Sequence, residues 1–277
     1  MGPAGLGSAS VVWAALFTTA AWAAPAGDAQ QQRRNVTVLL SDLQGDPLGS
    51  AVVVAAAEDG YWLATNQHVV DERGRLCVLS VSGKPEAALV IPIKASNPNN
   101  ALDLALLWLP ARPDAGPGQR KAVARFAPAQ PTGNDLPLVV ASGYPSPMGA
   151  NQSRPEYREA RGLLLPLLKQ PLQGGFDLSS TAAVQKGMSG GGVFLGSDLI
   201  GINGTHADPL WPGVLLSETG KPIEPALNER LELVSLAISA PVLQKTLQAA
   251  VLPSRQRLRS LADAVCLEKK PSPLPSR

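Results

Sequence analysis

The sequence is poor in several residue types that reveal a function directly. Its 277 residues include only 2 cysteines, 2 histidines, and 5 Trp, 3 Tyr and 4 Phe. Two histidines and two widely spaced cysteines do not make a typical zinc site, so we expect no metal. A net charge of +2 gives little attraction for nucleic acid, and so few aromatic rings offer few stacking platforms for bases. The sequence therefore predicts no nucleic-acid partner.

Charged side chains are absent from residues 1–27, where Val11–Ala24 forms an apolar stretch that ends in small residues. This pattern predicts a secretory signal peptide, residues 1–26, cut near Ala23 or Ala26. An uncleaved membrane anchor is the alternative, but glycine and proline at both ends leave fewer than the roughly 20 residues that a membrane-spanning helix needs. We expect an exported protein, periplasmic or secreted, with no membrane span after signal removal.

The two cysteines lie far apart in the sequence. Cys77 stands in an apolar run, and Cys266 is near the end of the chain. An exported protein could pair them. The interpretation that we favour is a small core residue at Cys77 and a separate thiol at Cys266.

Glycine and proline, at 26 residues each, cut the chain into short segments, while 45% hydrophobic residues suffice for a substantial core. Eleven runs are rich in Val, Leu and Ile and are mostly bounded by Gly, Pro, Asn or Asp, as strands are. These runs are Asn35–Leu40, Ala51–Ala57, Tyr61–Thr65, Leu76–Val81, Ala88–Ile93, Leu102–Leu109, Leu136–Ala141, Ser179–Val184, Gly192–Leu195, Leu199–Asn203 and Leu231–Ile238. Because no long helices alternate with them, antiparallel barrels or sandwiches are favoured over a parallel α/β sheet.

Helical spacing of apolar residues appears only late in the chain. It covers Ala240–Ala250, where Pro241 stands in the first turn and is tolerated. A second helix is predicted over Ser254–Glu268. Residues 251–277 form a basic tail that ends in a Pro-rich stretch, predicted to be disordered. Contact with an anionic surface is one explanation of the basic charge, and a solvated helix face is the commoner one.

A serine within a run of glycines is the most specific chemical signal. On either side of Ser189, Gly187 and Gly190 can adopt backbone angles that other residues avoid. Such a turn can expose the hydroxyl and point successive backbone N–H groups at one place, as an oxyanion hole requires. A Gly-rich hairpin with an incidental serine is the alternative. Because a serine hydroxyl is a weak nucleophile at neutral pH, catalysis also needs a base.

His68 is the candidate base, and Asp103 is the candidate acid that orients it. His68 follows a short apolar run, which places it at a strand end or in the next turn. Asp103 is a lone acid in an apolar run, where a buried carboxylate needs a hydrogen-bonded partner such as an imidazole N–H. The alternatives are a packed or surface histidine and an acid that caps backbone donors. Asp71 is a rival carboxylate, but it lies very near His68 in a turn-like segment.

The three candidates occur in the order His68, Asp103, Ser189, with gaps of 35 and 86 residues. This arrangement resembles the trypsin-like (chymotrypsin-fold) serine proteases, especially their exported bacterial members. Three segments are similar to the family's Thr-x-x-His-Val-Val, Asp-Leu-Ala-Leu-Leu and Gly-x-Ser-Gly-Gly motifs. They are Thr65–Val70, Asp103–Leu107 and Gly187–Gly191.

Two further segments extend the resemblance over residues 35–250. Gly49–Val53 resembles a first-barrel strand, and Leu199–Gly204 is similar to the strand that lines the primary specificity pocket. The resemblance implies an all-β fold of two six-stranded antiparallel barrels, residues 35–125 and 130–240, with a C-terminal helix.

The resemblance also implies the position and the chemistry of the active site. The site would lie in the cleft between the barrels, the first of which would supply His68 and Asp103 and the second Ser189. The backbone N–H groups of Gly187 and Ser189 would form the oxyanion hole. Met188 replaces the aspartate that pairs with a freed N-terminus in digestive members, so we expect no zymogen switch of that type.

The specificity pocket departs from the Lys- and Arg-selective members of that family. Ala183, six residues before Ser189, removes the acidic floor that binds a basic side chain. We therefore expect a small or apolar residue to be accepted, while His206 and Lys186 would favour an acidic residue as the alternative. The residues expected to line the pocket are Ala183, Lys186, Asn203 and Gly204.

The expected function is that of a serine endopeptidase, which hydrolyses peptide bonds of a polypeptide substrate through a Ser-His-Asp triad and an acyl-enzyme intermediate. No metal or organic cofactor is implied. The alternative from another class is an exported protease-like binding module without turnover. Such a module has no physical reason to keep all three triad residues. A non-peptidase acyl hydrolase is disfavoured, because the strand–turn–helix context of a nucleophile elbow is missing around Ser189.

Overall fold

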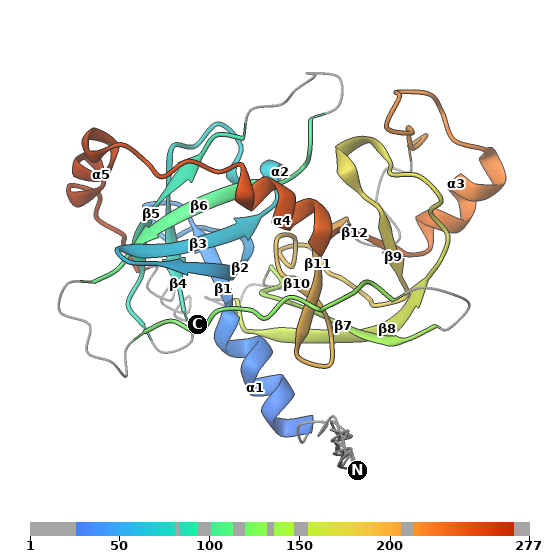
Figure 1. The fold of residues 1–277 in the computed structure, drawn as a ribbon, viewed down its shortest axis with the longest axis horizontal. Coiled ribbons are helices and arrows are strands. Elements are labelled where there is room, and N and C mark those ends of the chain that lie inside the picture. The colour runs from blue at the N-terminus through green and yellow to red at the C-terminus, as the bar shows by residue number, and fades with distance from the viewer. Residues whose placement is uncertain are drawn as a thin grey trace, which may run out of the picture.

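The computed structural model describes residues 26–80, 83–93, 101–112, 120–131, 136–146, 155–205 and 213–268. Within these ranges the strands form two closed six-stranded antiparallel barrels that lie side by side (Figure 1). The predicted all-β fold of two barrels and a C-terminal helix is confirmed. The predicted signal peptide falls almost entirely on residues 1–25, and the Pro-rich end falls on residues 269–277, both outside the described ranges. No helix in the described ranges is long and apolar enough to cross a membrane.

The first barrel is built from strands in the spatial order β1-β2-β3-β6-β5-β4. These strands are β1 (Thr37–Ser41), β2 (Pro47–Ala57), β3 (Gly60–Thr65), β4 (Arg75–Leu79), β5 (Glu86–Ile91) and β6 (Ala105–Pro110). Successive side chains of a strand point to opposite faces, so alternate residues fill the interior. The buried residues that do so include Val38, Leu40, Ala51, Val53 and Leu107.

The second barrel has the order β10-β11-β12-β9-β8-β7. Its strands are β7 (Leu138–Gly143), β8 (Arg158–Leu165), β9 (Leu178–Ser180), β10 (Gly192–Leu195), β11 (Asp198–Thr205) and β12 (Ser235–Ser239). The interior is again aliphatic and includes Val139, Leu164, Val193 and Ile200. Each barrel therefore has an apolar core of its own.

An apolar cluster is shared by the two barrels. Trp62 of β3 and Trp108 of β6 form an edge-to-face pair with ring centroids 5.1 Å apart. Phe194 of β10 and Ile202 of β11 belong to the same buried cluster. Because aromatic side chains bury large apolar areas, this cluster fixes the position of one barrel against the other.

Local structure differs from the predicted elements in several places, among them the helix predicted over Ser254–Glu268, which covers only Arg255–Ala262. Strand β8 is not predicted, because Arg158, Glu159 and Arg161 make its first half look polar. At the N-terminus, helix α1 (Ala26–Val36) takes the first two residues of a predicted strand. Helix α3 (Pro225–Glu232) likewise takes the start of the run predicted as the last strand, and proline at its first position suits a helix start.

Helix α1 precedes β1 and is anchored to the second barrel. Arg33, which is 4% exposed, makes a paired contact with the Glu159 carboxylate, at 2.9 Å and 3.0 Å. The Nη1 atom of Arg33 donates to the carbonyl oxygen of Gly196, 2.5 Å away. At the start of β1, the hydroxyl group of Thr37 shares a hydrogen bond of 2.9 Å with that of Ser142 on β7 of the second barrel. The buried ion pair is satisfied on both sides, as a buried charge must be.

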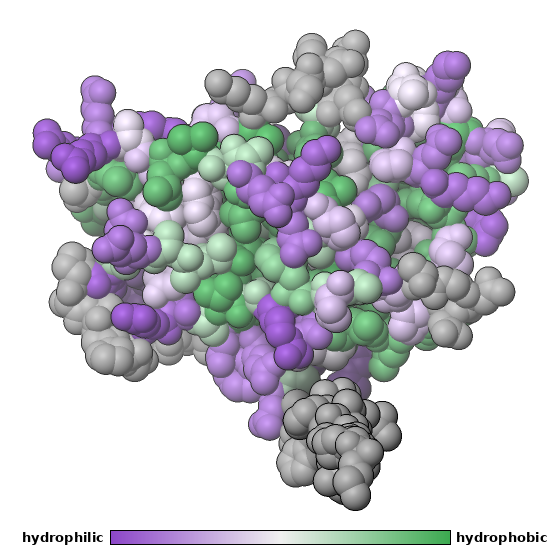
Figure 2. Space-filling view, viewed as in Figure 1, coloured by the Kyte–Doolittle hydropathy of each residue, from purple (hydrophilic) through white to green (hydrophobic). Residues whose placement is uncertain are grey.

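The C-terminal segment runs from the second barrel onto the first (Figure 1). Helix α4 (Ala240–Gln248), at the position predicted for a helix, packs on β11 and β12, while α5 (Arg255–Ala262) contacts β5. Arg257 of α5 donates a hydrogen bond of 2.7 Å to the Val90 carbonyl. Hydrophobic and hydrophilic residues are interspersed over the face that this segment crosses (Figure 2). This segment, residues 240–268, thus connects the two barrels, and we call it the C-terminal strap.

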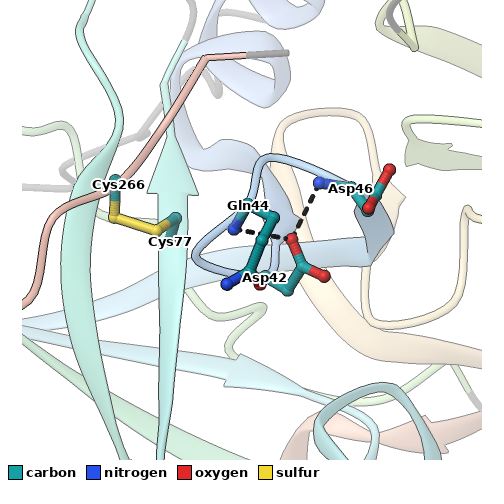
Figure 3. Close-up of a disulfide and its surroundings, with 5 residues drawn as sticks. All are labelled: Asp42, Gln44, Asp46, Cys77 and Cys266. Carbon is teal, nitrogen blue, oxygen red and sulfur yellow. Dashed lines mark hydrogen bonds between the residues drawn. A yellow bond between two sulfur atoms is a disulfide. The ribbon is translucent and has the colours of Figure 1, made fainter.

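Cys77 and Cys266 form a disulfide (Figure 3), which corrects the expectation of two separate thiols. Cys77 lies on β4, and Cys266 follows α5 at a Cα–Cα distance of 5.8 Å. Beside the disulfide, the N–H of Leu267 donates to the Leu43 carbonyl at 3.0 Å. Asp42 caps two backbone N–H groups of this same turn. The cysteines are 189 positions apart, so their pairing cannot be read from the sequence, and only the folded C-terminal segment brings them together.

The disulfide closes a very long loop, so removing it should increase the entropy of the unfolded chain. We expect the double variant Cys77→Ala/Cys266→Ala to lose about 2–4 kcal/mol of unfolding free energy. Urea denaturation followed by circular dichroism measures this loss, and reduction of the wild type with dithiothreitol should reproduce it. Two titratable thiols in the purified, unreduced chain would contradict the pairing.

Candidate active site

His68 and Asp103 are in direct contact at one end of the first barrel. Strand β3 ends at Thr65, and the short helix α2 (Gln67–Val70) that follows carries His68. The ring Nδ1 of His68 lies 2.7 Å from Oδ2 of Asp103, and the His68 backbone N–H donates to Oδ1 at 2.9 Å. In a neutral ring that donates from Nδ1–H to this carboxylate, Nε2 is the acceptor. The His68 side chain is 50% exposed and that of Asp103 is 18% exposed.

Asp103 is held by groups from both barrels. The side-chain amide of Asn66, fully buried at the start of α2, donates to the Asp103 carbonyl at 2.9 Å. The Asp103 N–H donates to the carbonyl of Gly174, 2.8 Å away. Gly174 belongs to the second barrel, in the short 3₁₀ turn Gln173–Gly175, and has φ 85°. The backbone of Asp103 is therefore held by hydrogen bonds other than those that its carboxylate makes with His68.

Ser189 lies in a tight turn between two glycines with positive φ. Gly187 has φ 92° and Gly190 has φ 83°, values that favour glycine. The turn is closed by a hydrogen bond from the Met188 N–H to the Gln185 carbonyl, at 2.9 Å. The hydroxyl of Ser189 donates to the Gly204 carbonyl at 3.0 Å. This is the backbone conformation that the Gly-rich segment predicts.

The peptide between Lys186 and Gly187 has a fixed orientation. Its carbonyl oxygen accepts a hydrogen bond from the Ser146 N–H at 2.7 Å. In a planar trans peptide the C=O and N–H bonds point in opposite directions. The N–H of Gly187 therefore points away from Ser146. An orientation of this kind is what a donor of an oxyanion hole requires.

The serine turn is packed against the part of the first barrel that carries His68. The N–H of Ser50 on β2 donates to the Ser189 carbonyl at 2.8 Å. A methyl group on Gly190 would overlap the Ser50 carbonyl oxygen and the Thr65 hydroxyl. A methyl group on Gly49 would lie 2.8 Å from the side chain of Val69, the residue after His68. The structure thus brings the Ser189 turn to the end of the barrel where His68 and Asp103 meet.

The four predicted pocket residues have different surroundings. Ala183 and Lys186 are exposed. Asn203 is 2% exposed, and its amide donates to the Ser142 carbonyl at 3.0 Å, so this side chain supports the barrel wall. A methyl group on Gly204 would overlap the ring of Phe176. His206, proposed as an alternative specificity determinant, lies outside the described residues.

Asp177 is a second partly buried acid, close in sequence to Phe176. Its carboxylate accepts hydrogen bonds from the Ser239 N–H at 2.7 Å and from the Ser239 hydroxyl at 2.5 Å. Burial raises the pKa of Asp177 above its ordinary value, and the two Ser239 bonds oppose the rise. These contacts join the start of β9 to the start of α4. The Asp177 carboxylate therefore holds the junction between β12 and α4.

A family model described as the trypsin-like peptidase domain matches residues 49–202. This match covers more than half of the chain and includes His68, Asp103 and Ser189. The chain therefore belongs to the trypsin-like peptidase family. No curated protein gives a significant match.

Several solved structures share the fold. The HtrA-type protease AlgW with a decapeptide is 18% identical with a TM-score of 0.54, over 81% of this chain and 67% of that one. AlgW with a tripeptide is 19% identical with a TM-score of 0.55, over 81% and 63%. A serine endoprotease from Yersinia pestis is 20% identical with a TM-score of 0.53, over 81% and 66%. This chain thus spans about two thirds of the length of these proteins, and the likeness establishes the fold.

Two residues of the site have no role that the sequence predicts. Asn66 stands in the motif around His68, and Ser50 stands in a strand-like segment. Both are fully buried and polar, and both bond to the backbone of a candidate catalytic residue. A polar residue beside a motif was the one available signal, because these contacts join segments far apart in the sequence.

The packing around Gly190 makes a sharp prediction. Gly190→Ala and Gly196→Ala both place a side chain at positive φ, which costs about 1–2 kcal/mol. Only at Gly190 does the new methyl group also overlap Ser50 and Thr65, whereas nothing lies within 4 Å of it at Gly196. We therefore expect Gly190→Ala to lose a further 1–3 kcal/mol or so of unfolding free energy, measured by urea denaturation. Equal losses in the two variants would show that the turn is not packed as described.

Proposed function

We propose that this chain is a serine endopeptidase that cleaves polypeptides through His68, Asp103 and Ser189. The observation that carries the proposal is the 2.7 Å contact between His68 Nδ1 and Asp103, made beside the glycine turn of Ser189. Family membership and the fold shared with solved proteases support the same reaction. The backbone N–H of His68 binds the other oxygen of the same carboxylate, so ring and carboxylate are held in one relative orientation.

In the proposed mechanism Ser189 Oγ attacks the carbonyl carbon of the scissile peptide while His68 Nε2 takes the hydroxyl proton. The negative charge then rests on the former carbonyl oxygen, where the N–H groups of Gly187 and Ser189 stabilise it. Asp103 holds the imidazole in orientation and stabilises its positive charge. His68 next donates the proton to the leaving amine, and the C–N bond breaks to give an acyl-enzyme. Water, activated by His68, releases the acid product and restores the hydroxyl of Ser189.

The hydroxyl of Ser189 needs one movement before attack. It donates to the Gly204 carbonyl in the structure, so the side chain must turn to direct its O–H toward His68. Such a rotation exchanges one hydrogen bond for another, and hydrogen bonds of a catalytic site often align only when substrate is bound.

The proposed substrate is a polypeptide with a small or apolar side chain before the scissile bond. Two of the similar structures hold peptides, which supports the substrate class. Val184, next to Ala183, is buried with Ala141, Ala182 and Met188, so the chain beside Ala183 is packed on an apolar cluster. The exposed Lys186 keeps an acidic residue as the alternative. We further propose that the chain works outside the cytoplasm, after removal of the predicted signal peptide.

An activated serine would react with a fluorophosphonate, which bonds covalently to the nucleophile. We expect one adduct per chain on the wild type by intact mass, and none on Ser189→Ala. His68→Ala and Asp103→Asn should react at least about 100-fold more slowly, because the base is lost or held in the wrong tautomer.

The matched control is Ser179→Ala, which removes a buried hydroxyl that is bonded to the Leu165 carbonyl and makes no contact with His68, Asp103 or the Ser189 turn. It should react as the wild type does. Folded wild type that takes no adduct would refute the proposed reaction and would leave the protease-like binding module as the better account.

The C-terminal residues of the cleavage products show which side chains the pocket accepts. When the wild type digests an unfolded protein, mass spectrometry of the new C-termini should show Ala, Val and other small or apolar residues in excess over their frequency in the substrate. Ends enriched in Asp and Glu would instead favour the acidic alternative, and Lys186→Ala should then reduce the cleavage. Ends enriched in Lys and Arg would contradict both versions of the pocket.

A further inference from the structure

Ser50 is a buried serine of the first barrel that contacts the turn of Ser189. It lies on β2 and is 0% exposed. Its hydroxyl donates to the Gly187 carbonyl at 2.8 Å and accepts from the Tyr144 N–H at 2.8 Å. Its N–H donates to the Ser189 carbonyl at 2.8 Å. Donor and acceptor of one small side chain are therefore both engaged.

These bonds fix alternate peptides of the turn. The peptide after Gly187 is held at its C=O by the Ser50 hydroxyl and at its N–H by the Gln185 carbonyl, which is 2.9 Å from that nitrogen. The peptide after Ser189 is held at its C=O by the Ser50 N–H and at its N–H by the Asn203 carbonyl, at 2.9 Å. Neither peptide can rotate without breaking a bond at each end.

The two peptides that alternate with these, one before the first and one between the two, carry the N–H groups of the proposed oxyanion hole. The N–H of Gly187 belongs to the peptide whose carbonyl is bonded to Ser146, and that of Ser189 to the peptide whose carbonyl accepts from Gly191 at 3.0 Å. Since peptides share Cα atoms, locking their neighbours limits the rotation of these two as well. The Ser50 hydroxyl is thus the one side-chain group among these contacts that holds the turn in the orientation catalysis needs.

Ser50 is also tied to the histidine side of the site. Its carbonyl accepts a hydrogen bond of 2.7 Å from the hydroxyl of Thr65, the last residue of β3. His68 follows three residues later, on α2. A single residue of the first barrel therefore connects the strand that leads to the base with the turn that carries the nucleophile.

We propose that Ser50 is a positioning residue, whose hydroxyl holds the Gly187–Ser189 backbone so that both N–H groups point at the developing oxyanion. The inference rests on the proposed serine endopeptidase function. Ser50 touches neither the substrate nor the reacting atoms, so its effect must appear in the stabilisation of the transition state and not in the binding of the substrate.

The test compares Ser50→Ala with Ser179→Ala, two variants that each lose one buried hydroxyl bonded to a backbone carbonyl. We expect kcat of Ser50→Ala on a peptide substrate to fall about 10- to 100-fold, less than the loss from deleting an oxyanion donor outright. KM and the pH profile should stay near those of the wild type, because the contact between His68 and Asp103 is untouched. Ser179→Ala should keep the kcat of the wild type.

Binding of a peptide boronate, which forms a tetrahedral adduct with an active serine, gives a second readout. Its affinity should fall by the same factor as kcat, while that of the product peptide should not change. Equal kcat in Ser50→Ala and Ser179→Ala would overturn the inference. So would a parallel loss of boronate and product affinity, which indicates a structural role only. If Ser50→Ala does not fold, Ser50→Cys, a weaker donor of similar size, replaces it under the same criteria.

Labelling and turnover of the wild type distinguish a failure of this inference from a failure of the proposed function. If the wild type takes no fluorophosphonate adduct, the proposed function fails, and with it the role of Ser50. If the wild type labels and turns over while Ser50→Ala does so equally well, only the role of Ser50 is refuted.

Discussion

The structure depends on holding a glycine turn in a backbone conformation that it would not keep alone. Gly187 and Gly190 have positive φ, and a free chain with these residues would sample many other conformations. Contacts with the first barrel, through Ser50 and Thr65, and with the second, through Asn203 and Ser146, select one of them. The turn that carries Ser189 is thus positioned by contacts with both barrels and by neither barrel alone. The candidate site therefore lies where the two barrels meet.

The interface is stabilised at several levels. Apolar burial around Trp62, Trp108 and Phe194 supplies the non-directional part, and hydrogen bonds such as that between Thr37 and Ser142 fix the register. At the periphery, α1 is anchored by the ion pair between Arg33 and Glu159, and the C-terminal strap by its disulfide. Burying an ion pair costs free energy, which its mutual attraction and hydrogen bonds largely offset. The pair between Arg33 and Glu159 therefore fixes the position of α1 more than it adds to the free energy of unfolding.

The sequence carried the fold class and the triad candidates, because both depend on local patterns. Val- and Leu-rich runs between turns indicate strands, and His68, Asp103 and Ser189 each stand in a short motif with a recognisable chemical reason. The features that the sequence did not predict depend on contacts between distant segments. Arg158 and Glu159 make β8 look polar, although Glu159 is buried once Arg33 meets it. The pairing of Cys77 with Cys266 and the four contacts of Ser50 likewise exist only after the barrels have closed.

The central claim is that Ser189 becomes acylated by its substrate, and a quenched-flow experiment tests it most directly. A peptide ester with a small apolar acyl residue should acylate the serine faster than water removes it. Intact mass after acid quench should then show a transient acyl adduct on Ser189, together with a burst of the released alcohol equal to one per active chain. Turnover of the ester with no adduct and no burst under the same conditions, or an adduct that survives in Ser189→Ala, would contradict the account.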